Sequence, residues 1–117
     1  MQDFRNLKVW QKAHALTLAA YKETVDFPSH ELFGLRLQMR RTAAAIPMKI
    51  ADASGRTGDE DVVRCLQAGM GSASEFEYQC ILAHDLGYVS AERHGLLVQD
   101  VIEVKKMLAS FIKTVRG

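Results

Sequence analysis

Cysteine and proline are scarce in this sequence, with two of each among 117 residues. Cys65 and Cys80 fall within one predicted helix. At ~1.5 Å of rise per residue they would lie ~22 Å apart, which excludes a disulfide between them. Cysteines that cannot pair are typical of a reducing compartment, so we expect the protein to be cytoplasmic. The low proline content, together with only eight glycines, argues against a loop-rich or disordered chain.

Long apolar runs are also missing. No stretch approaches the ~18 apolar residues that a membrane-spanning helix needs. The N-terminal segment carries Asp3 and no long apolar stretch, so we do not expect a secretory signal or a membrane partner. With 48% hydrophobic and 25% charged residues, the composition is that of one globular domain, which we expect to span residues 1–117.

The patterns of catalytic and cofactor sites are absent as well. No Glu-x-x-His pair occurs, although a di-iron site in a helical bundle needs two such pairs. There is no glycine-rich phosphate loop, and neither cysteine has a histidine–acid pattern beside it. The four histidines are dispersed along the chain: His14, His30, His84 and His94. We therefore expect no enzyme, no metal and no cofactor.

Hydrophobic residues do recur at helical spacings, and these predict four helices. We expect them at about residues 7–26, 31–54, from Thr57 to 86, and 91–115. The buried stripe predicted for the first helix is Leu7, Trp10, His14, Leu18, Tyr21 and Val25. The second is Leu35, Met39, Thr42, Ile46, Ile50 and Ala53. The third is Val62, Leu66, Gly69, Ala73, Phe76, Cys80 and Ala83. The fourth is Leu97, Val101, Val104, Leu108, Phe111 and Val115.

Short polar residues and glycines suggest where these helices begin and end. We expect Ser29 and Ser90 to be N-caps, and Thr57 with Glu60 to form a capping box at the third helix. Gly87 is expected to close that helix as its C-terminal cap. Gly69 and Gly71 inside it would mark close contact with another backbone, because glycine costs a helix up to about 1 kcal/mol relative to alanine.

Pro47 falls inside the apolar pattern of the second helix. An interior proline removes a backbone donor and kinks or breaks a helix. Because the apolar spacing continues on both sides, we expect one helix bent at Pro47 rather than two helices. Four helices with short connections predict an all-α, antiparallel, up-down-up-down four-helix bundle.

A second apolar row on the fourth helix exceeds what a bundle of this size can bury. Its members are Val98, Ile102, Ala109 and Ile112. Such surplus rows are candidates for contacts between subunits, so we expect a homo-oligomer.

The charge is distributed unevenly although its total is only +1. Residues 1–58 hold nine Lys/Arg and five Asp/Glu, giving +4, and residues 59–117 hold six and nine, giving −3. One interpretation is a basic surface for RNA or DNA. Its candidate residues are Arg36, Arg40, Lys49, Arg56, Lys8 and Lys12, together with Arg5. No aromatic residues interleave with them to stack on bases.

The other interpretation of the charged residues is structural. Arg40 or Arg41 would pair with Glu75 or Glu77, inside the bundle or across subunits, because a buried charge needs a partner. Trp10 and Tyr78 are expected to be core or interface anchors. Ser72 lies inside a helix, where its hydroxyl most simply bonds the backbone four residues earlier. The expected structural or interface set is thus Trp10, Arg41, Pro47, Ser72, Glu75 and Tyr78.

Several short segments, spread over more than a hundred residues, resemble one known family. They are Phe4, Leu7, Val9-Trp10-Gln11, Phe27-Pro28, Glu31, Leu35, Gln38, Arg40-Arg41, Ile46-Pro47, Ile50-Ala51, Gly55-Arg56, Gly71-Ser72, Glu75, Glu77-Tyr78-Gln79, Leu82-Ala83 and Asp85-Leu86-Gly87-Tyr88. The family is that of the four-helix bundle proteins named after the intervening sequence of bacterial 23S ribosomal RNA. The resemblance implies a four-helix bundle that assembles into a five-fold ring, with no known enzymatic activity. A related group serves diversity-generating retroelements as an accessory subunit that binds a reverse transcriptase and nucleic acid.

The sequence departs from this family around Pro47. The family commonly reads S-I-P-x-N-I-A-E-G. This chain instead has Ala45 for the serine, Lys49 for the asparagine, Asp52 for the glutamate and Ala53 for the glycine. A function carried by those polar residues is therefore in doubt here. We expect a non-catalytic cytosolic assembly or adaptor protein that forms a homo-oligomeric, pentameric ring and binds a protein partner. The alternative is a nucleic-acid-binding accessory protein that acts with RNA or a polymerase.

Overall fold

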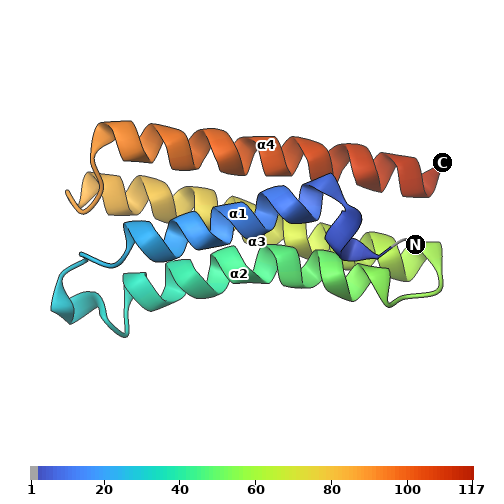
Figure 1. Ribbon diagram of the computed structural model, residues 1–117, viewed down its shortest axis with the longest axis horizontal. Helices are drawn as coiled ribbons and strands as arrows, with labels where there is room; N and C mark the ends of the chain where they lie inside the picture. Colours follow the sequence, from blue (N-terminus) through green and yellow to red (C-terminus); the bar gives the residue numbers. More distant parts are fainter. Residues whose placement is uncertain (1–2) are drawn as a thin grey trace.

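The computed structural model describes residues 3–117 and consists of four long helices side by side (Figure 1). They are α1 (Lys8–Glu23), α2 (Leu35–Ser54), α3 (Asp59–Asp85) and α4 (Ala91–Arg116). Two 3-10 turns, η1 (Phe4–Asn6) and η2 (Ser29–Glu31), precede α1 and α2. No strand occurs within residues 3–117, and the predicted all-α four-helix bundle is confirmed.

Each helix packs against two others, in the order α1, α2, α3, α4 and back to α1. The helices α1 and α3 therefore lie across one diagonal of the bundle. In Figure 1 successive helices run in opposite directions along the longest dimension, 44 Å. Salt bridges join the first helix to the last: Lys12 Nζ lies 3.0 Å from Glu103, and Arg93 Nη1 lies 2.6 Å from Glu23.

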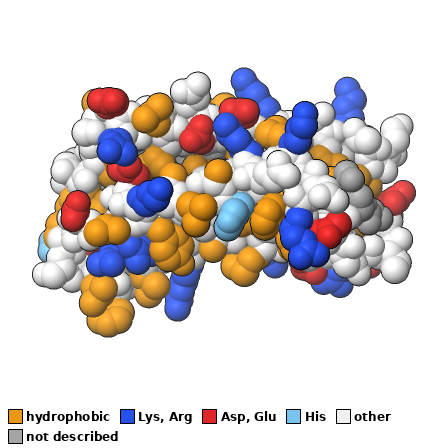
Figure 2. All heavy atoms as spheres, viewed as in Figure 1, with side chains coloured by type: hydrophobic (Ala, Val, Ile, Leu, Met, Phe, Trp, Pro, Cys, Tyr) orange, Lys and Arg blue, Asp and Glu red, His pale blue; other side chains and the backbone are white. Residues whose placement is uncertain are grey.

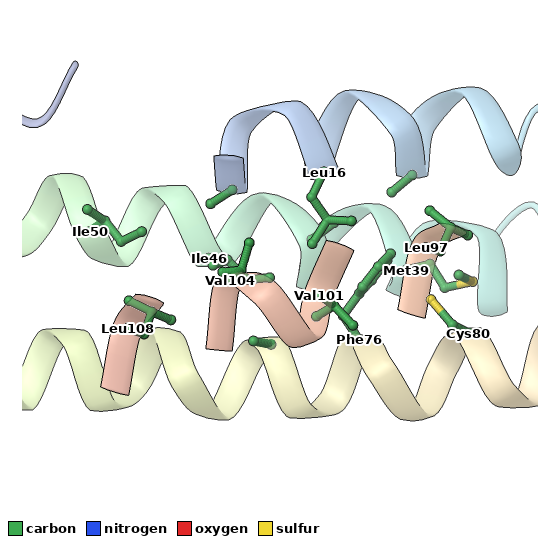
Figure 3. Packing of buried hydrophobic residues seen from close by; sticks show 14 of the residues in the cluster. Leu16, Met39, Ile46, Ile50, Phe76, Cys80, Leu97, Val101, Val104 and Leu108 are labelled. Atoms are coloured by element: carbon green, nitrogen blue, oxygen red, sulfur yellow. The ribbon is translucent and has the colours of Figure 1, made fainter. Parts of the chain in front are cut away.

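The core is a single column of apolar side chains from all four helices (Figure 3). Phe76 of α3 is completely buried and points among Leu16 of α1, Met39 of α2 and Val101 of α4. Truncating such a phenylalanine to alanine typically costs about 3–5 kcal/mol, because the bundle cannot collapse fully around the cavity.

The predicted buried stripes are right for three of the helices. All seven residues predicted for α3 are buried. In α2 the prediction holds except that Ala43 is buried and its neighbour Thr42 is only half-buried. In α4 the stripe ends on Ile112, while Phe111 and Val115 pack against the core half-buried.

Helix α2 runs without interruption through Pro47, as predicted, and Pro47 is buried. A bend at this position stays a prediction. Proline cannot donate to the carbonyl four residues earlier, which belongs to Ala43. The structure supplies another donor, because Thr17 Oγ1 of α1 lies 3.0 Å from Ala43 O and 2.9 Å from Ala13 O. The hydroxyl of Thr17, itself buried, thus satisfies the carbonyl that Pro47 leaves without its helical partner.

Two of the expected helix ends are confirmed. Ser90 Oγ accepts a hydrogen bond from the Arg93 amide at 3.2 Å. Gly87 has a φ of 81° and ends α3, with the Tyr88 amide donating to Ala83 O at 2.9 Å. This backbone conformation favours glycine, and the bonds satisfy carbonyls that the helix end would leave free.

Two other expected caps are wrong. Ser29 does not cap α2, because the chain forms η2 first and α2 begins only at Leu35. Thr57 and Glu60 do not form a capping box, since Gly58 occupies the N-cap position and α3 has no side-chain cap. Instead, the first turn of α3 carries three acidic residues, Asp59, Glu60 and Asp61. Their negative charges interact favourably with the positive end of the helix dipole.

Glu31 caps α2 in place of Ser29. Its Oε1 accepts from the Leu35 amide at 3.0 Å, and its Oε2 accepts from Tyr88 Oη at 2.9 Å. Gly34 leaves room for this carboxylate, because a Cβ at Gly34 would lie 2.5 Å from Glu31 Oε1. The Leu35 amide and then the Tyr88 hydroxyl lower the pKa of Glu31, since both favour the charged carboxylate. One side chain therefore ties the α1–α2 connection to the α3–α4 connection.

The hydrogen bond between Thr17 and Ala43 can be tested with a double-mutant cycle. We expect Thr17→Val to lower the free energy of unfolding by about 1–3 kcal/mol, because it leaves a buried carbonyl without a donor. Pro47→Ala restores a backbone N–H for that carbonyl. In the Pro47→Ala background, Thr17→Val should therefore cost distinctly less, as measured by urea unfolding at fixed chain concentration. Equal costs in the two backgrounds would contradict the role assigned to Thr17.

The pKa of Glu31 leads to a pH-dependent prediction. A lowered pKa in the folded state contributes stability that is present above the ordinary value of 4.5 and is lost as the pH falls through the folded value. Glu31→Gln should lower the melting temperature by a few degrees at neutral pH, and this gap should close toward about pH 3. Melting followed by circular dichroism checks this, and a gap that stays constant with pH would count against it.

Candidate interaction surfaces

One helix presents its most prominent apolar stripe to solvent. On α1 the side chains of Leu18, Tyr21 and Val25 are 52%, 45% and 55% exposed, so the stripe predicted for the core of this helix is wrong. The residues that α1 buries lie one position away, about 100° around the helix. They are Val9, Ala13, Leu16, Thr17 and Ala20. We call Trp10, His14, Leu18, Tyr21 and Val25 the outer stripe of α1.

The outer stripe lies on the side of α1 that faces α2. The rings of Trp10 and His14 stack with centroids 5.0 Å apart and an angle of 8° between their planes. These two side chains line a shallow groove with Phe4, Thr17, Ala44, Pro47, Met48 and Ala51. Met48 is 59% exposed, so α2 extends the apolar surface. Figure 2 looks onto this face, where hydrophobic side chains gather along both helices.

A smaller apolar surface lies on the other side of the bundle, where α3 and α4 meet. Glu77 of α3 and Lys105 of α4 form an ion pair there, with Oε1 and Nζ 3.0 Å apart. Ile81, one turn after Glu77, and Ile102, three residues before Lys105, are both exposed. Of the second row predicted on α4, Ile102 and Ala109 are exposed, Val98 is half-buried, and Ile112 is buried in the core.

The basic residues predicted to contact nucleic acid do not form one strip on a single chain. Arg40 lies at the α1–α2 seam, where its Nε donates to Thr24 Oγ1 at 2.8 Å and its Nη2 donates to Tyr21 O at 3.1 Å. Arg40 therefore donates hydrogen bonds to a backbone carbonyl and a hydroxyl at the C-terminal end of α1. Lys12 lies at the α1–α4 seam, where it pairs with Glu103 and Asp100, and the glutamate raises its pKa most strongly.

The other basic candidates are equally dispersed. Arg56 pairs with Asp52 on its own helix, Nη2 to Oδ1 3.1 Å. Lys49 faces α3 and lies beside Gly69, whose added Cβ would be 3.4 Å from the Lys49 Cβ. Lys8 borders α4 in a groove with Lys106. Arg36 is half-buried near the start of α2, and Arg5 pairs with Asp3.

The proposed arginine–glutamate pair is not formed within the described chain. Arg40 bonds the end of α1, Glu77 pairs with Lys105, and Arg41 and Glu75 are both exposed. A pair across subunits stays a prediction. Of the remaining candidates, Trp10 and Ser72 are half-buried and Tyr78 is 61% exposed.

Two histidines in contact and a buried cysteine are the remaining residues to place. His84 and His94 stack with centroids 4.6 Å apart, yet residues 3–117 contain no cluster of three or more His, Cys, Asp or Glu suited to a metal ion. Burial raises the pKa of the Cys80 thiol to about 12, which keeps it protonated and unreactive. Within the same residues, no helix has the length and hydrophobicity to cross a lipid bilayer.

Three features escaped the sequence reasoning. The hydroxyl of Thr17 donates to the Ala43 carbonyl of another helix. The sequence indicates only a hydrogen bond to the carbonyl of Ala13, four residues earlier on the same helix. Tyr88 and Glu31 belong to different connections, so their bond had no local signal. Phe33, 83% exposed in the α1–α2 connection, could have been noticed as an aromatic residue in a turn.

The comparisons with known proteins agree with this fold. The pattern of the 23S rRNA-intervening sequence protein family matches residues 5–110. A crystal structure of a protein of unknown function from the S23 ribosomal protein family of Bacteroides thetaiotaomicron is similar, with a TM-score of 0.81 and 25% sequence identity. The match covers 90% of this chain and 98% of that one. No curated protein matches significantly. The chain belongs to the 23S rRNA-intervening sequence protein family.

Proposed function

We propose that this protein is a non-catalytic, homo-oligomeric assembly or adaptor protein of the cytosol, whose copies form a ring. The observation that carries the proposal is the outer stripe of α1, which with Met48 leaves large apolar side chains in water. Burying apolar surface contributes about 25 cal/mol per Å², so a contiguous stripe of this kind favours association. The five-fold symmetry of the ring rests on the family resemblance.

Other features are consistent with this proposal. The thiol of Cys80 is protonated at neutral pH and cannot act as a nucleophile there. The free thiols of Cys65 and Cys80 fit a reducing cytosol. Long rigid helices hold the outer stripe in a fixed geometry, which a repeating assembly requires.

A matched pair of leucine substitutions tests the assembly. Leu18 and Leu96 are exposed to 52% and 54%, but only Leu18 belongs to the outer stripe. We expect the wild-type protein to show one discrete mass of several chains in light scattering. Leu18→Glu should reduce it to that of a single chain, because the new charge cannot be buried in the contact. Leu96→Glu should leave the mass unchanged. A wild-type protein that stays a single chain at all concentrations would refute the proposal.

A second candidate function, binding of RNA or DNA, is favoured by the charge of the first two helices. Between Lys8 and Lys22, and between Leu35 and Ala51, the chain has no Asp or Glu. The same segments carry Lys8, Lys12, Lys22, Arg36, Arg40, Arg41 and Lys49. In a ring, each copy would present these two basic segments, so weak contacts with phosphates would add up.

Salt dependence tests this second function. If RNA binds, the logarithm of its affinity should fall linearly with the logarithm of salt concentration. Exchanging Lys8, Arg36 and Lys49 for glutamine should then reduce the slope by about 2, since each lost phosphate contact removes ~0.7 on single-stranded RNA. Lys113→Gln on α4 is the control and should have no effect. No retention at low salt of either a mixed RNA pool or mixed DNA would exclude nucleic acid as a partner.

A further inference from the structure

A groove between α2 and α3 is lined by polar side chains that have no partner within the described chain. It encloses about 420 Å³, and Leu35 of α2 and Leu82 of α3 form its apolar part. Its polar side chains are those of Gln38, Ser74, Glu75, Tyr78 and Gln79. Within residues 3–117, none of these five side chains makes a hydrogen bond or an ion pair with another residue. The neighbouring Glu77, by contrast, pairs with Lys105.

The amide oxygen of Gln79 is buried and has no hydrogen-bond donor. Its Oε1 is shielded from solvent, although the residue as a whole is only half-buried. Buried polar atoms are hydrogen-bonded in the great majority of cases, so an unsatisfied one calls for an explanation. The terminal torsion of a glutamine rotates over a broad range, so the amide can present this oxygen to the groove that Gln79 lines. A ligand in the groove would then supply the missing donor.

Glu75 gives the groove a negative charge. Its side chain is exposed, and no lysine or arginine of the described chain lines the groove beside it. Arg41 of α2, three residues after Gln38, is exposed as well and forms no ion pair with Glu75. A carboxylate without a partner and an amide oxygen without a donor both favour a ligand that is positively charged and rich in N–H groups.

Tyr78 adds an exposed aromatic ring to the same groove. Its side chain is 61% exposed. A cation over the face of such a ring, within about 6 Å of its centroid, is attracted by the electrons of the ring. Arg40 shows this arrangement elsewhere in the chain: its guanidinium carbon lies 4.7 Å from the centroid of Tyr21, while its Nε donates to Thr24 Oγ1. A planar guanidinium can stack on a ring and donate hydrogen bonds at the same time, whereas an ammonium cannot.

We propose that this groove binds an arginine side chain of a partner protein. The inference rests on the adaptor role proposed above, to which it adds the chemistry of the partner. In this arrangement the guanidinium lies over the ring of Tyr78 and donates to Glu75 and to Gln79 Oε1. The methylene groups of the arginine cover Leu35 and Leu82, because the stem of this side chain is apolar.

A protein segment suits the groove better than a free small cation. The groove is open to solvent along the two helices. Pockets that hold small molecules usually enclose most of the surface of the ligand, which an open groove cannot do. An arginine within a peptide brings neighbouring residues with it, and these can contact Gln38 and Ser74 beside the guanidinium site.

Retention of defined peptide pools on the immobilised protein tests the inference. Three pools of short peptides carry arginine, lysine or citrulline at the centre and random residues elsewhere. Citrulline has the shape of arginine without its charge, so we expect the arginine pool to bind about tenfold more tightly than the citrulline pool. The lysine pool should also bind more weakly than the arginine pool. Equal retention of any two of these pools that include arginine would overturn the inference, as would free arginine that competes as well as the peptides.

Substitutions in the groove separate binding from stability. Gln79→Leu replaces the unsatisfied amide by an apolar side chain, so the melting temperature should stay the same or rise. Retention of the arginine pool should fall about tenfold in this variant and in Glu75→Gln, since each removes an acceptor of the guanidinium. Glu92→Gln is the matched control, because it removes an exposed carboxylate of α4 outside the groove. Wild-type retention in Gln79→Leu or Glu75→Gln, or an equal loss in Glu92→Gln, would contradict the site.

The peptide experiment and the mass measurement fail independently. A protein that assembles but does not distinguish arginine from citrulline refutes only the groove as a site for arginine. A protein that stays a single chain at all concentrations refutes the proposed assembly, whichever peptides it retains.

Discussion

The bond between Thr17 and the carbonyl of Ala43 sets the rotation of α1, and the rest of the surface follows from that rotation. Pro47 takes away the amide that would normally satisfy this carbonyl, and the hydroxyl of Thr17 reaches it from α1. Thr17 must therefore face inward. Ala13, Leu16 and Ala20 turn inward with it, and the larger side chains of Trp10, Leu18 and Tyr21 turn outward. The small inner residues also let α1 lie close to its neighbours.

Polar contacts at one end of the bundle hold this arrangement in place. Glu31 caps α2 and accepts a hydrogen bond from Tyr88 in the opposite connection. Phe27 packs against the ring of Tyr88, with centroids 5.2 Å apart. Arg40 bonds the last turn of α1 and lies over Tyr21, with its guanidinium carbon 4.7 Å from the ring centroid. These contacts fix the axial position of α1, so its outer stripe keeps a defined height relative to α3.

The sequence predicted the helices better than it predicted what each helix buries. In α3 one apolar stripe dominates, and all seven residues that its periodicity predicted are buried, while Val63 is the one buried residue of α3 that it missed. In α1 two stripes of similar periodicity compete, and the one with larger side chains, through Leu18 and Tyr21, was taken for the core. The hydrogen bond from Thr17 to a carbonyl of α2 accompanies the burial of the smaller stripe, and no local pattern in the sequence shows that bond. The ion pairs of Lys12 could not be predicted either, because its partners Asp100 and Glu103 lie near the other end of the chain.

The packing of the first helix against the last has a consequence for the order of folding during synthesis. The salt bridges from Glu23 to Arg93 and from Lys12 to Glu103 cannot form until α4 has left the ribosome. Until then α1 lacks one of the two neighbours that cover its inner stripe, and a nascent chain exposes both stripes at once. Exposed apolar surface of this kind makes an incomplete chain prone to incorrect association. In the proposed assembly, contacts between copies acquire a fixed geometry only after the last helix has closed the bundle.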